Sequence, residues 1–444
     1  MNWKLERILP EVEKPARYTG GEYNQIIKER ADVDLRFALC FPDTYEIGMS
    51  NLGVRILYGL LNEINGVWCE RVFAPWGDME AELRKAAIPL YALESGDNIS
   101  DFDVLGFSLG YELSYTNVLN VMDLSGIPLR SDARNGKDPL IIAGGTCAYN
   151  PEPLAPFIDL FVLGEGEDVL PELVSLLRKA KQEAWEKPFL LRKAAEISGI
   201  YVPLLYTVSY HPDGTVREVS PIDKAPRTVI KRIVQNLDAS YFPDHPIVPS
   251  TEVVHDRVIL EVFRGCIRGC RFCQAGYAYR PVRAKSQNRL REQGIAACQS
   301  TGYQEMTLSS LSTSDYRNLN GLCDDLLAFC EPRSISLSLP SLRADNFSLA
   351  LMERVQHVRK SGLTFAPEAG TQRLRDAINK NVTEEDLLSS CAVAFSGGWN
   401  AVKLYFMLGL PTETDEDVLG IADLARKVLW TWKKTAANKS HGVR

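Results

Sequence analysis

The sequence lacks any run of about 18 uncharged apolar residues, so it predicts no helix that could cross a membrane. Its start, MNWKLERILPEVEKPARY, mixes charges with prolines and contains no apolar segment typical of a secretory signal. The 50 Lys and Arg are outnumbered by 57 Asp and Glu, and the net charge of −7 excludes a basic field over the whole surface that would attract nucleic acid or membranes. We expect a cytoplasmic protein with no membrane partner.

Histidine is also scarce, because the chain has five and the first of them is His211. The first 210 residues therefore offer no imidazole to a metal. Disulfide frameworks of small secreted domains need dense cysteines, whereas the ten cysteines here are scattered through 444 residues apart from one group of three. This pattern is typical of reduced thiols in a cytoplasmic protein, and a disulfide-bridged secreted protein is the alternative.

The group of three comprises Cys266, Cys270 and Cys273, in C-x3-C-x2-C spacing. Gly265 and Gly269 precede the first two, and a backbone without Cβ can turn tightly enough to aim the sulfurs inward. Three thiolates hold three irons of a cubane iron–sulfur cluster and leave the fourth iron open to a small molecule. Structural zinc sites need further ligands to close a tetrahedron, and none lies at ligand spacing. Zinc and plain buried thiols remain the alternatives.

The length and the hydrophobic pattern predict an α/β protein of two to three domains. From residue 34 short apolar runs alternate with amphipathic runs of helix length, which indicates βαβ units and a parallel sheet. We expect an arm at 1–33 that packs on the surface, a Rossmann-like doubly wound parallel sheet at 34–181, a connector with a β-hairpin at 182–255 and a partial (β/α) barrel at 256–444.

The expected elements follow the same alternation. In the first domain, strands are expected at 35–42, 71–76, 89–95, 103–110, 139–145 and 160–167, and helices at 51–64, 77–87, 112–126 and 167–181. In the connector, Asp213-Gly214 between two alternating runs predicts the hairpin turn. In the barrel, strands are expected to begin near 258, 305, 334, 363 and 400, with helices at 287–302, 316–330, 348–362, 371–378, 383–398 and 415–432.

The cysteine spacing, with Phe272 before the third cysteine, resembles the signature of the radical SAM superfamily. The resemblance implies a [4Fe-4S] cluster on the three cysteines, with S-adenosylmethionine (SAM) chelating the open iron. It also implies a reductant such as flavodoxin or ferredoxin, and cleavage of SAM to methionine and a 5′-deoxyadenosyl radical. Phe272 would lie near the adenine, and an apolar core position is its alternative. RNA modification and methyl or methylthio transfer are candidate reactions on an unknown substrate.

Loops after the later strands also resemble the superfamily. Glu368 would contact the ribose hydroxyls of SAM, and its alternative is an acid that stabilises a helix N-terminus. Gly409 begins GLPTET, which is similar to the Gly-x-Pro-x-Glu-Thr loop beside the adenine. Ser309, Ser310 and Ser312 stand where the family usually has a Gly-Gly-Glu motif that receives the methionine amino group.

Two charged residues stand at or inside expected strands of the barrel. Arg343 would suit the carboxylate of SAM, since a guanidinium can grip a carboxylate with two hydrogen bonds. Lys403 is expected to face a carboxylate or the cluster, because an unpaired buried charge is costly. A structural ion pair is the alternative for each.

The family's barrel has six strands, and we expect this chain to lack the sixth. This expectation gives weight to an alternative function, a non-catalytic iron–sulfur or zinc protein that binds RNA or a partner.

The first domain resembles the cobalamin-binding domain found before many radical SAM domains. Its motif D-x-H-x-x-G corresponds to Asp43, Tyr45 and Gly48, so the histidine that ligates cobalt is replaced by tyrosine. The other candidate cobalamin residues lie at the carboxyl ends of expected strands: Ser108, Gly144, Gly145, Gly164 and Gly166. If cobalamin binds here, its lower axial histidine cannot come from this domain. A Rossmann-like scaffold without the ligand is the alternative.

One local run of charge contrasts with the acidic whole. From Arg257 to Arg291 the chain has nine Lys or Arg and a single acid, Glu261, and Tyr277 and Tyr279 lie among them. Basic residues interleaved with aromatic residues suit contact with phosphates and stacking on bases, so RNA is a candidate partner. The alternative is that these cations compensate the negative charge of bound cofactors or solvate a helix face.

Overall fold

The structure is a computed structural model that describes residues 3–339 and 363–436. The chain forms two compact units, 1–235 with 239–256 and 236–238 with 257–444. No helix in the described ranges is both long enough and apolar enough to span a membrane.

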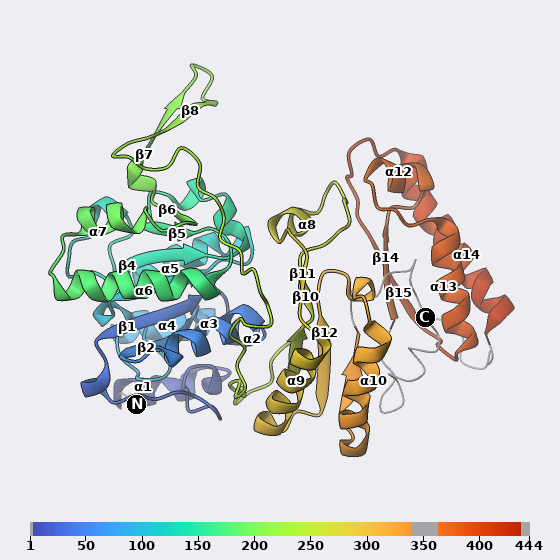
Figure 1. Ribbon diagram of the computed structural model, residues 1–444, viewed down its shortest axis with the longest axis horizontal. Helices are drawn as coiled ribbons and strands as arrows, with labels where there is room; N and C mark the ends of the chain where they lie inside the picture. Colours follow the sequence, from blue (N-terminus) through green and yellow to red (C-terminus); the bar gives the residue numbers. More distant parts are fainter. Residues whose placement is uncertain (1–2, 340–362, 437–444) are drawn as a thin grey trace. The chain divides into compact units, whose positions relative to one another are not determined.

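The first unit is built on a six-stranded sheet in the order β2-β1-β3-β4-β5-β6 (Figure 1). Its strands are β1 Leu35–Phe41, β2 Val67–Phe73, β3 Val104–Ser108, β4 Leu140–Gly144, β5 Leu160–Val162 and β6 Ile200–Tyr201. All neighbours pair in parallel except β6, which is antiparallel to β5 at the edge. Every residue of β1 and β2 is buried, so both faces of the sheet are covered, as in doubly wound folds. The predicted fold class is confirmed.

The strand order reverses between β1 and β3, and ligands of such sheets bind beyond the carboxyl ends of the strands at this point. The main helices of the unit are α3 Leu52–Glu63, α4 Gly77–Ala86, α5 Tyr115–Leu124, α6 Gly166–Gln182 and α7 Lys187–Ala194. α3 begins at the cap residue Asn51, whose side chain accepts a hydrogen bond from the Val54 amide.

Two expectations for the first unit need correction. The apolar run 89–95 forms no strand, because its backbone bonds as an irregular segment: the Leu93 amide donates to the Arg71 carbonyl and the Leu90 amide to the Leu124 carbonyl. The N-terminal residues, expected to lie on the surface, enter the core through Leu5 and Ile8, which are both buried. The apolar run 89–95 is thus buried without pairing as a strand of the sheet, and the residue pattern alone does not reveal this.

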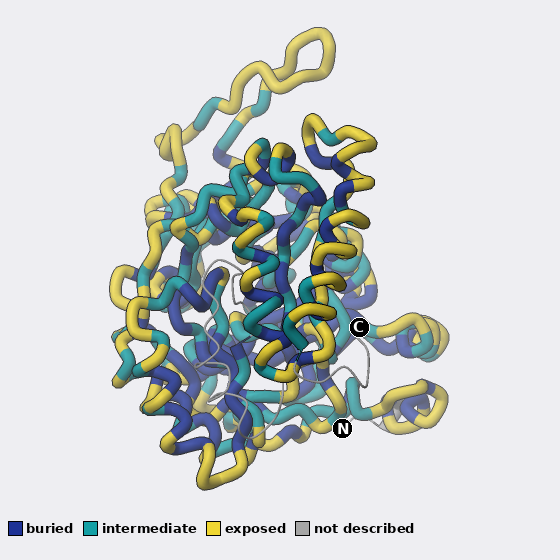
Figure 2. Tube along the Cα trace, turned by 90° about the vertical axis from the view of Figure 1, so that its right-hand side faces the viewer, coloured by how far each residue is buried: buried dark blue, intermediate teal, exposed yellow. Residues whose placement is uncertain are grey.

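The expected hairpin is present as β7 Tyr206–Tyr210 and β8 Val216–Pro221, with Asp213 and Gly214 between them. Its strands are exposed along most of their length (Figure 2). The amide and the hydroxyl of Thr215 both donate to the Asp213 carboxylate, which fixes the turn.

The second unit alternates strands and helices as a partial barrel does. Three parallel strands are ordered β13-β12-β9, and two further parallel strands are β14 and β15. The bounds are β9 Val258–Glu261, β12 Glu305–Ser309, β13 Ser336–Ser338, β14 Leu363–Glu368 and β15 Val402–Phe406. The helices include α9 Gln287–Thr301, α10 Leu319–Cys330, α12 Gln372–Ala377, α13 Glu384–Ser396 and α14 Asp415–Thr435. The helix expected at 348–362 lies outside the described residues.

Alternate residues of β14 and β15 face opposite ways. Phe365 is buried in a cluster with residues of α13 and α14, and Leu404 packs against this cluster. The residues next to Phe365 and Leu404 in each strand point to the other face of the sheet. There, Thr364 lies opposite Lys403 in register. This second face of the sheet carries the polar side chains, and the carboxyl ends of its strands lead into the loops considered next.

Candidate functional site

The three cysteines lie on a loop that follows β9 and the short strand β10 Phe263–Arg264, and it ends at α8 Gln274–Ala278. β10 pairs with β11 Arg283–Ala284, so the chain turns back on itself immediately around the thiols. Gly265 has φ +88°, and a Cβ there would lie 2.8 Å from the carbonyl oxygens of Tyr279 and Pro281. Glycine is therefore required for the turn that brings the loop back.

All three thiols, of Cys266, Cys270 and Cys273, are partly exposed. The Arg268 amide donates to Cys266 Sγ and the Gly276 amide to Cys273 Sγ, each at 3.4 Å. These two hydrogen bonds fix the positions of two of the three sulfurs within the loop.

Within the described parts of the chain, no three His, Cys, Asp or Glu side chains are grouped to hold a single metal ion. A closed zinc site needs such a group around one ion, whereas a cubane cluster spreads its thiolates over separate irons. The structure places the three partly exposed thiols together on one loop.

The loop is anchored on the C-terminal end of α12. The Arg271 amide donates to the Ile378 carbonyl at 3.0 Å, and the Asn379 side chain donates to the Gly269 carbonyl at 2.8 Å. Phe272, from the same segment, packs against a cluster that includes Leu410. The structure thus brings the cysteine loop together with the loops that follow β14 and β15.

Glu368 ends β14 close to this aromatic ring. Its carboxylate accepts a hydrogen bond from Lys380 Nζ at 2.9 Å, and the same nitrogen lies 5.8 Å from the centre of the Phe272 ring. Glu368 has φ +67°, a left-handed conformation that is strained for a residue with a side chain. The Met407 amide donates to the Glu368 carbonyl at 2.8 Å and holds it in place.

The loop after β15 is held by two acids. The Gly409 amide donates to Glu413 Oε2 at 2.6 Å, and Gly409 has φ +81°. The buried carboxylate of Asp417 accepts hydrogen bonds from Thr371 and Arg373, which lie in the segment after β14. These bonds place the pKa of Asp417 well below its usual value, with the Thr371 hydroxyl bond as the largest cause. Asp417 therefore ties the two loops to each other.

Lys380 and Asp417 were not among the residues singled out from the sequence. For Asp417 a signal exists, because Thr414-x-x-Asp417 has the pattern of a capping box. For Lys380 there is none, since its contact with Glu368 depends on where α12 ends.

The serines after β12 are largely engaged with their own turn. Ser310 Oγ and Thr313 Oγ1 lie 2.9 Å apart, and the Ser312 amide donates to Ser310 Oγ. The carbonyl of Ser309 accepts the Val262 amide, which joins the turn to β9. Ser312 is buried, and its hydroxyl has no hydrogen-bond partner among the described residues.

Lys403 lies at an exposed position of β15. Its side chain is exposed, and Nζ lies 5.0 Å from the Tyr405 ring centre, with no carboxylate of the described residues paired to it. A charge that stays in water has no desolvation cost to offset, so it needs no partner. Arg343 lies outside the described residues.

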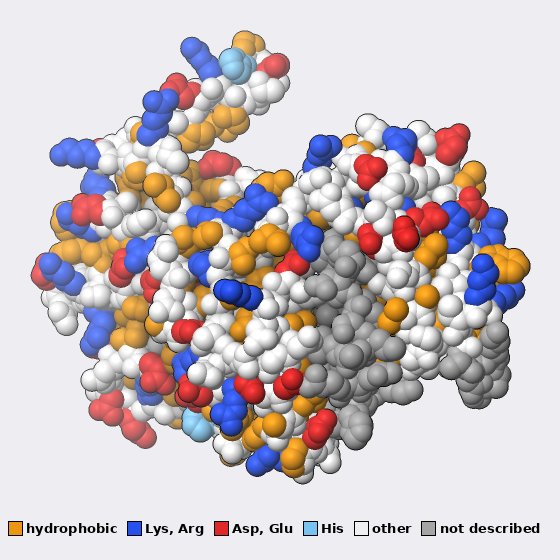
Figure 3. All heavy atoms as spheres, turned by 45° about the vertical axis from the view of Figure 1, so that its right-hand side comes forward, with side chains coloured by type: hydrophobic (Ala, Val, Ile, Leu, Met, Phe, Trp, Pro, Cys, Tyr) orange, Lys and Arg blue, Asp and Glu red, His pale blue; other side chains and the backbone are white. Residues whose placement is uncertain are grey.

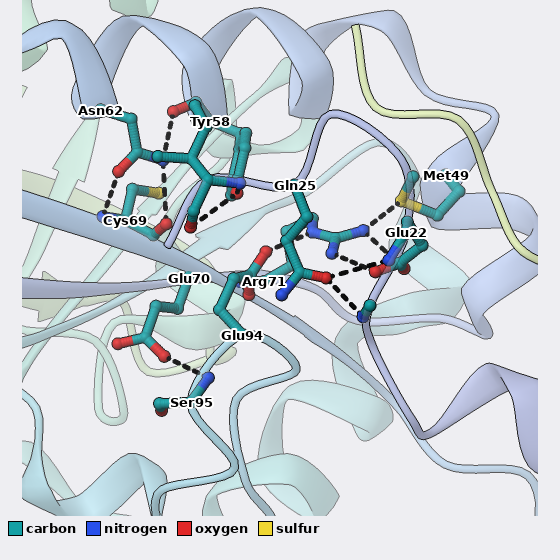
Figure 4. A network of polar contacts seen from close by, with 12 residues as sticks. Glu22, Gln25, Met49, Tyr58, Asn62, Cys69, Glu70, Arg71, Glu94 and Ser95 are labelled. Carbon is teal, nitrogen blue, oxygen red and sulfur yellow. Dashed lines mark hydrogen bonds and ion pairs between the residues drawn. The ribbon is translucent and has the colours of Figure 1, made fainter. Parts of the chain in front are cut away.

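In the first unit Tyr45 is buried, and its hydroxyl donates to Glu22 Oε1 at 2.9 Å. Glu22 also binds Arg71, whose Nε donates to Glu94 at 2.6 Å, so that the guanidinium lies between two carboxylates (Figure 4). Burial raises the pKa of Tyr45 well above its usual value. The residue at the motif position thus belongs to an internal ionic network.

The other candidate cobalamin positions contact the chain itself. A Cβ at Gly48 would collide with the Phe73 ring, one at Gly145 with Leu109 and one at Gly164 with the Arg232 carbonyl. Gly166 lies against Leu57 in the same way, and Ser108 pairs with Gly144 in register between β3 and β4. Asp43 accepts the Thr44 amide at 2.6 Å. Four of these glycines, Gly48, Gly145, Gly164 and Gly166, are thus packed against other segments of the chain.

Comparison with known proteins gives two family matches. Residues 53–203 match the model of the N-terminal domain of radical SAM proteins, and residues 260–425 match the model of the radical SAM superfamily. An uncharacterized protein of Methanocaldococcus jannaschii, MJ0966, is 28% identical over 397 residues, which cover 88% of this chain and 73% of that protein.

Two solved structures are similar in fold. OxsB, a cobalamin-dependent radical SAM enzyme solved with aqua-cobalamin and SAM, is 16% identical with a TM-score of 0.60, over 88% of this chain and 52% of OxsB. TsrM, a radical SAM methyltransferase from Kitasatospora setae, is 14% identical with a TM-score of 0.56, over 88% of this chain and 71% of TsrM. The chain thus spans about half the length of OxsB. The two family matches, together with the cysteine loop beyond a barrel strand, mean that this chain belongs to the radical SAM superfamily.

Proposed function

We propose that this protein is a radical SAM enzyme whose Cys266, Cys270 and Cys273 hold a [4Fe-4S] cluster. One observation carries the proposal: the cysteine loop is anchored on α12, so that Phe272 contacts the loops after β14 and β15. When bound, the cluster would supply an electron that cleaves SAM to methionine and a 5′-deoxyadenosyl radical.

The residues around the loop would bind and orient SAM. Phe272, packed with Leu410, offers an apolar ring edge and face to the adenine. The Glu368 carboxylate can accept hydrogen bonds from ribose hydroxyls, with Lys380 fixing its orientation. The buried hydroxyl of Ser312 is a further polar group for the methionine portion.

Among the candidate reactions, methyl transfer is the one that the similar structures support best, since TsrM is a methyltransferase of the same fold. RNA modification is the second candidate, and the basic run around the cysteines supports it. Two of those arginines already have acidic partners within the chain: Arg264 pairs with Glu261 at 2.8 Å and Arg268 with Asp315 at 2.6 Å.

OxsB binds cobalamin, but the first unit of this chain offers no axial ligand at the motif position. An axial ligand at position 45 would need a free donor atom, but the Tyr45 hydroxyl is buried and bonded to Glu22. The backbone of Arg232 covers Gly164, and Leu109 covers Gly145. These residues do not fit the role of a lower ligand, so no step of the proposed function runs through cobalamin.

The test is SAM cleavage by protein reconstituted anaerobically with iron and sulfide and reduced with dithionite. We expect visible absorbance of a cubane cluster and formation of 5′-deoxyadenosine. Cys270→Ala should abolish both, because the cluster would lose one of three protein ligands. Cys298→Ala is the matched control. This thiol is buried in α9, so its removal should leave the formation of 5′-deoxyadenosine unchanged. An iron-loaded parent protein that forms no 5′-deoxyadenosine would contradict the proposal.

A further inference from the structure

Helix α14 carries apolar side chains on a second face, away from the core. Its inner face is packed, because Leu424, Val428 and Trp432 are buried in the cluster shared with α13. Large apolar side chains also point into water, and Leu419 is 68% exposed and Trp430 58%. In Figure 1 the helix lies on the outside of its unit, beyond β14 and β15. A surface helix usually presents polar residues to water, so an apolar second face marks a contact surface.

The exposed apolar residues of α14 follow a regular spacing. Four of them recur at intervals of four, three and four residues: Val418, Ala422, Ala425 and Leu429. These intervals place the four in one line along the helix and are those of a coiled-coil seam. Leu419 and Trp430 each follow an end residue of this line and are more exposed than it. We call the six exposed residues the α14 stripe: Val418, Leu419, Ala422, Ala425, Leu429 and Trp430.

The α14 stripe is complementary to a second copy of itself in the antiparallel direction. When two such helices meet at a two-fold axis midway between Ala422 and Ala425, Ala422 lies opposite Ala425 of the second copy. Val418 then lies opposite Leu429 of the second copy, because both pairs are centred on the same point of the helix. Small side chains at the centre let the two backbones approach closely, and the larger side chains fill the space toward the ends.

The charges at the ends of α14 favour the same arrangement. The first turn carries Asp415 and Glu416, and the last turn carries Lys433 and Lys434. In an antiparallel pair the first turn of each helix lies beside the last turn of the other, so opposite charges meet at both ends. A parallel pair would bring like charges together, which is destabilising.

The same acids disfavour an anionic membrane as the occupant, because lipid headgroups of the same charge would repel them. The basic end of the helix is not a separate cationic region. Lys433 Nζ lies 4.8 Å from the centre of the Trp430 ring, so the basic last turn and the apolar stripe form one surface. Apolar side chains likewise lie next to Lys and Arg side chains on the visible surface of this unit (Figure 3).

We propose that the α14 stripe is the interface through which two copies of this chain pair, by antiparallel packing of α14 about a two-fold axis. The helix has 21 residues and is therefore about 30 Å long. A contact confined to one helix from each copy is smaller than a standard protein interface, so we expect dissociation in the micromolar range. The inference does not rest on the proposed function, since no residue of the α14 stripe holds the cluster or SAM.

The test is sedimentation velocity of the whole chain over a wide range of protein concentration. We expect the parent protein to pass from monomer to dimer as its concentration rises. Ala425→Glu should raise the dissociation constant about tenfold or more, because two carboxylates then enter the centre of the contact. Glutamate is a good helix former, so α14 itself stays intact. Ala81→Glu is the matched control, since Ala81 is an exposed alanine of α4 in the first unit, and it should pair as the parent does.

A charge exchange tests the direction of pairing. Lys433→Glu should weaken the dimer about fivefold, since acids then meet acids at both ends. Adding Asp415→Lys to the same chain makes the charges opposite again and should return the dissociation constant to near the parent value. If this second change failed to restore pairing, the antiparallel arrangement would be wrong.

Two further outcomes would overturn the inference. The first is an Ala425→Glu variant that pairs as tightly as Ala81→Glu, because the dimer would then use another surface. The second is a parent protein that stays monomeric at every concentration. Binding of that monomer to vesicles of phosphatidylserine and phosphatidylcholine, lost in Ala425→Glu, would then assign the α14 stripe to a lipid surface instead.

Discussion

Glu368 is held in a left-handed backbone conformation at the carboxyl end of β14. Such a conformation costs about 1–3 kcal/mol for a residue other than glycine and persists where the surroundings enforce it. Here the Lys380 ammonium binds the carboxylate and the Met407 amide binds the carbonyl. The left-handed conformation places the Glu368 carboxylate beside Phe272. An ordinary strand conformation at this residue would direct the carboxylate elsewhere.

For Glu368→Gln we therefore expect weaker binding of SAM, about tenfold or more, because a hydrogen bond to a charged acceptor contributes about 1.5–3 kcal/mol. Equilibrium dialysis of SAM against cluster-loaded protein measures this. Iron content should stay at the parent level, since Glu368 does not hold the cluster.

Glu384→Gln on α13 is the control, because this carboxylate pairs with Lys427 away from the loop. If Glu368→Gln bound SAM as tightly as Glu384→Gln does, the ribose role of Glu368 would be wrong.

Helices α13 and α14 begin in the same way. Each has a capping box, formed by Thr383 with Asp386 in α13 and by Thr414 with Asp417 in α14. In a capping box the threonine and the acid satisfy each other's free amides at the helix start. Only Asp417 also binds Thr371 and Arg373 of the loop after β14. The α14 box therefore combines a capping role with the positioning of a loop.

The matched pair Asp386→Asn and Asp417→Asn separates these roles. Both changes should lower the melting temperature, by about 2–4 °C for each kcal/mol lost in a unit of this size. Only Asp417→Asn should also weaken SAM binding, because the loops that carry Glu368 and Gly409 lose their tie. Thermal scans and SAM dialysis on the same preparations provide both readouts. Equal SAM affinity in the two variants would show that Asp417 is a cap and nothing more.

The two units differ in their buried tyrosines. The tyrosines whose pKa is most strongly raised lie in the first unit, with burial as the leading cause: Tyr45, Tyr58, Tyr91, Tyr201 and Tyr241. A phenol with a raised pKa keeps its proton in the folded state at a pH where the unfolded chain releases it. Above about pH 10 the folded state thus binds more protons, and the free energy of unfolding falls as pH rises.

We expect the first unit to be stable to alkali up to about pH 10 and then to lose about 1 kcal/mol for each such tyrosine by pH 11. Urea unfolding followed by hydrogen exchange and mass spectrometry reports each unit separately. Tyr45→Phe should reduce the alkaline loss, since one titrating phenol is removed. A first unit whose urea midpoint stayed constant between pH 9 and 11 would contradict the burial of these phenols.

Much of the architecture followed from local pattern. The alternation of apolar runs predicted the parallel sheet and the barrel units, because burial of both sheet faces demands such runs. The pair Asp213-Gly214 predicted the hairpin, because its turn depends on those residues alone. The segment 89–95 shows the limit, since an apolar run can be buried as a loop when its amides find partners far away in the sequence, as that of Leu93 does with Arg71.

The sequence by itself determined the cysteine spacing, the glycine turn before Cys266 and the alternation of strands and helices, since each depends on residues close together in the chain. Only the tertiary structure decided that Tyr45 bonds to Glu22, that Lys403 remains in water and that Lys380 holds Glu368. The reason is physical: the environment of a charge or hydroxyl depends on which distant segments exclude water from it, and no spacing rule encodes that.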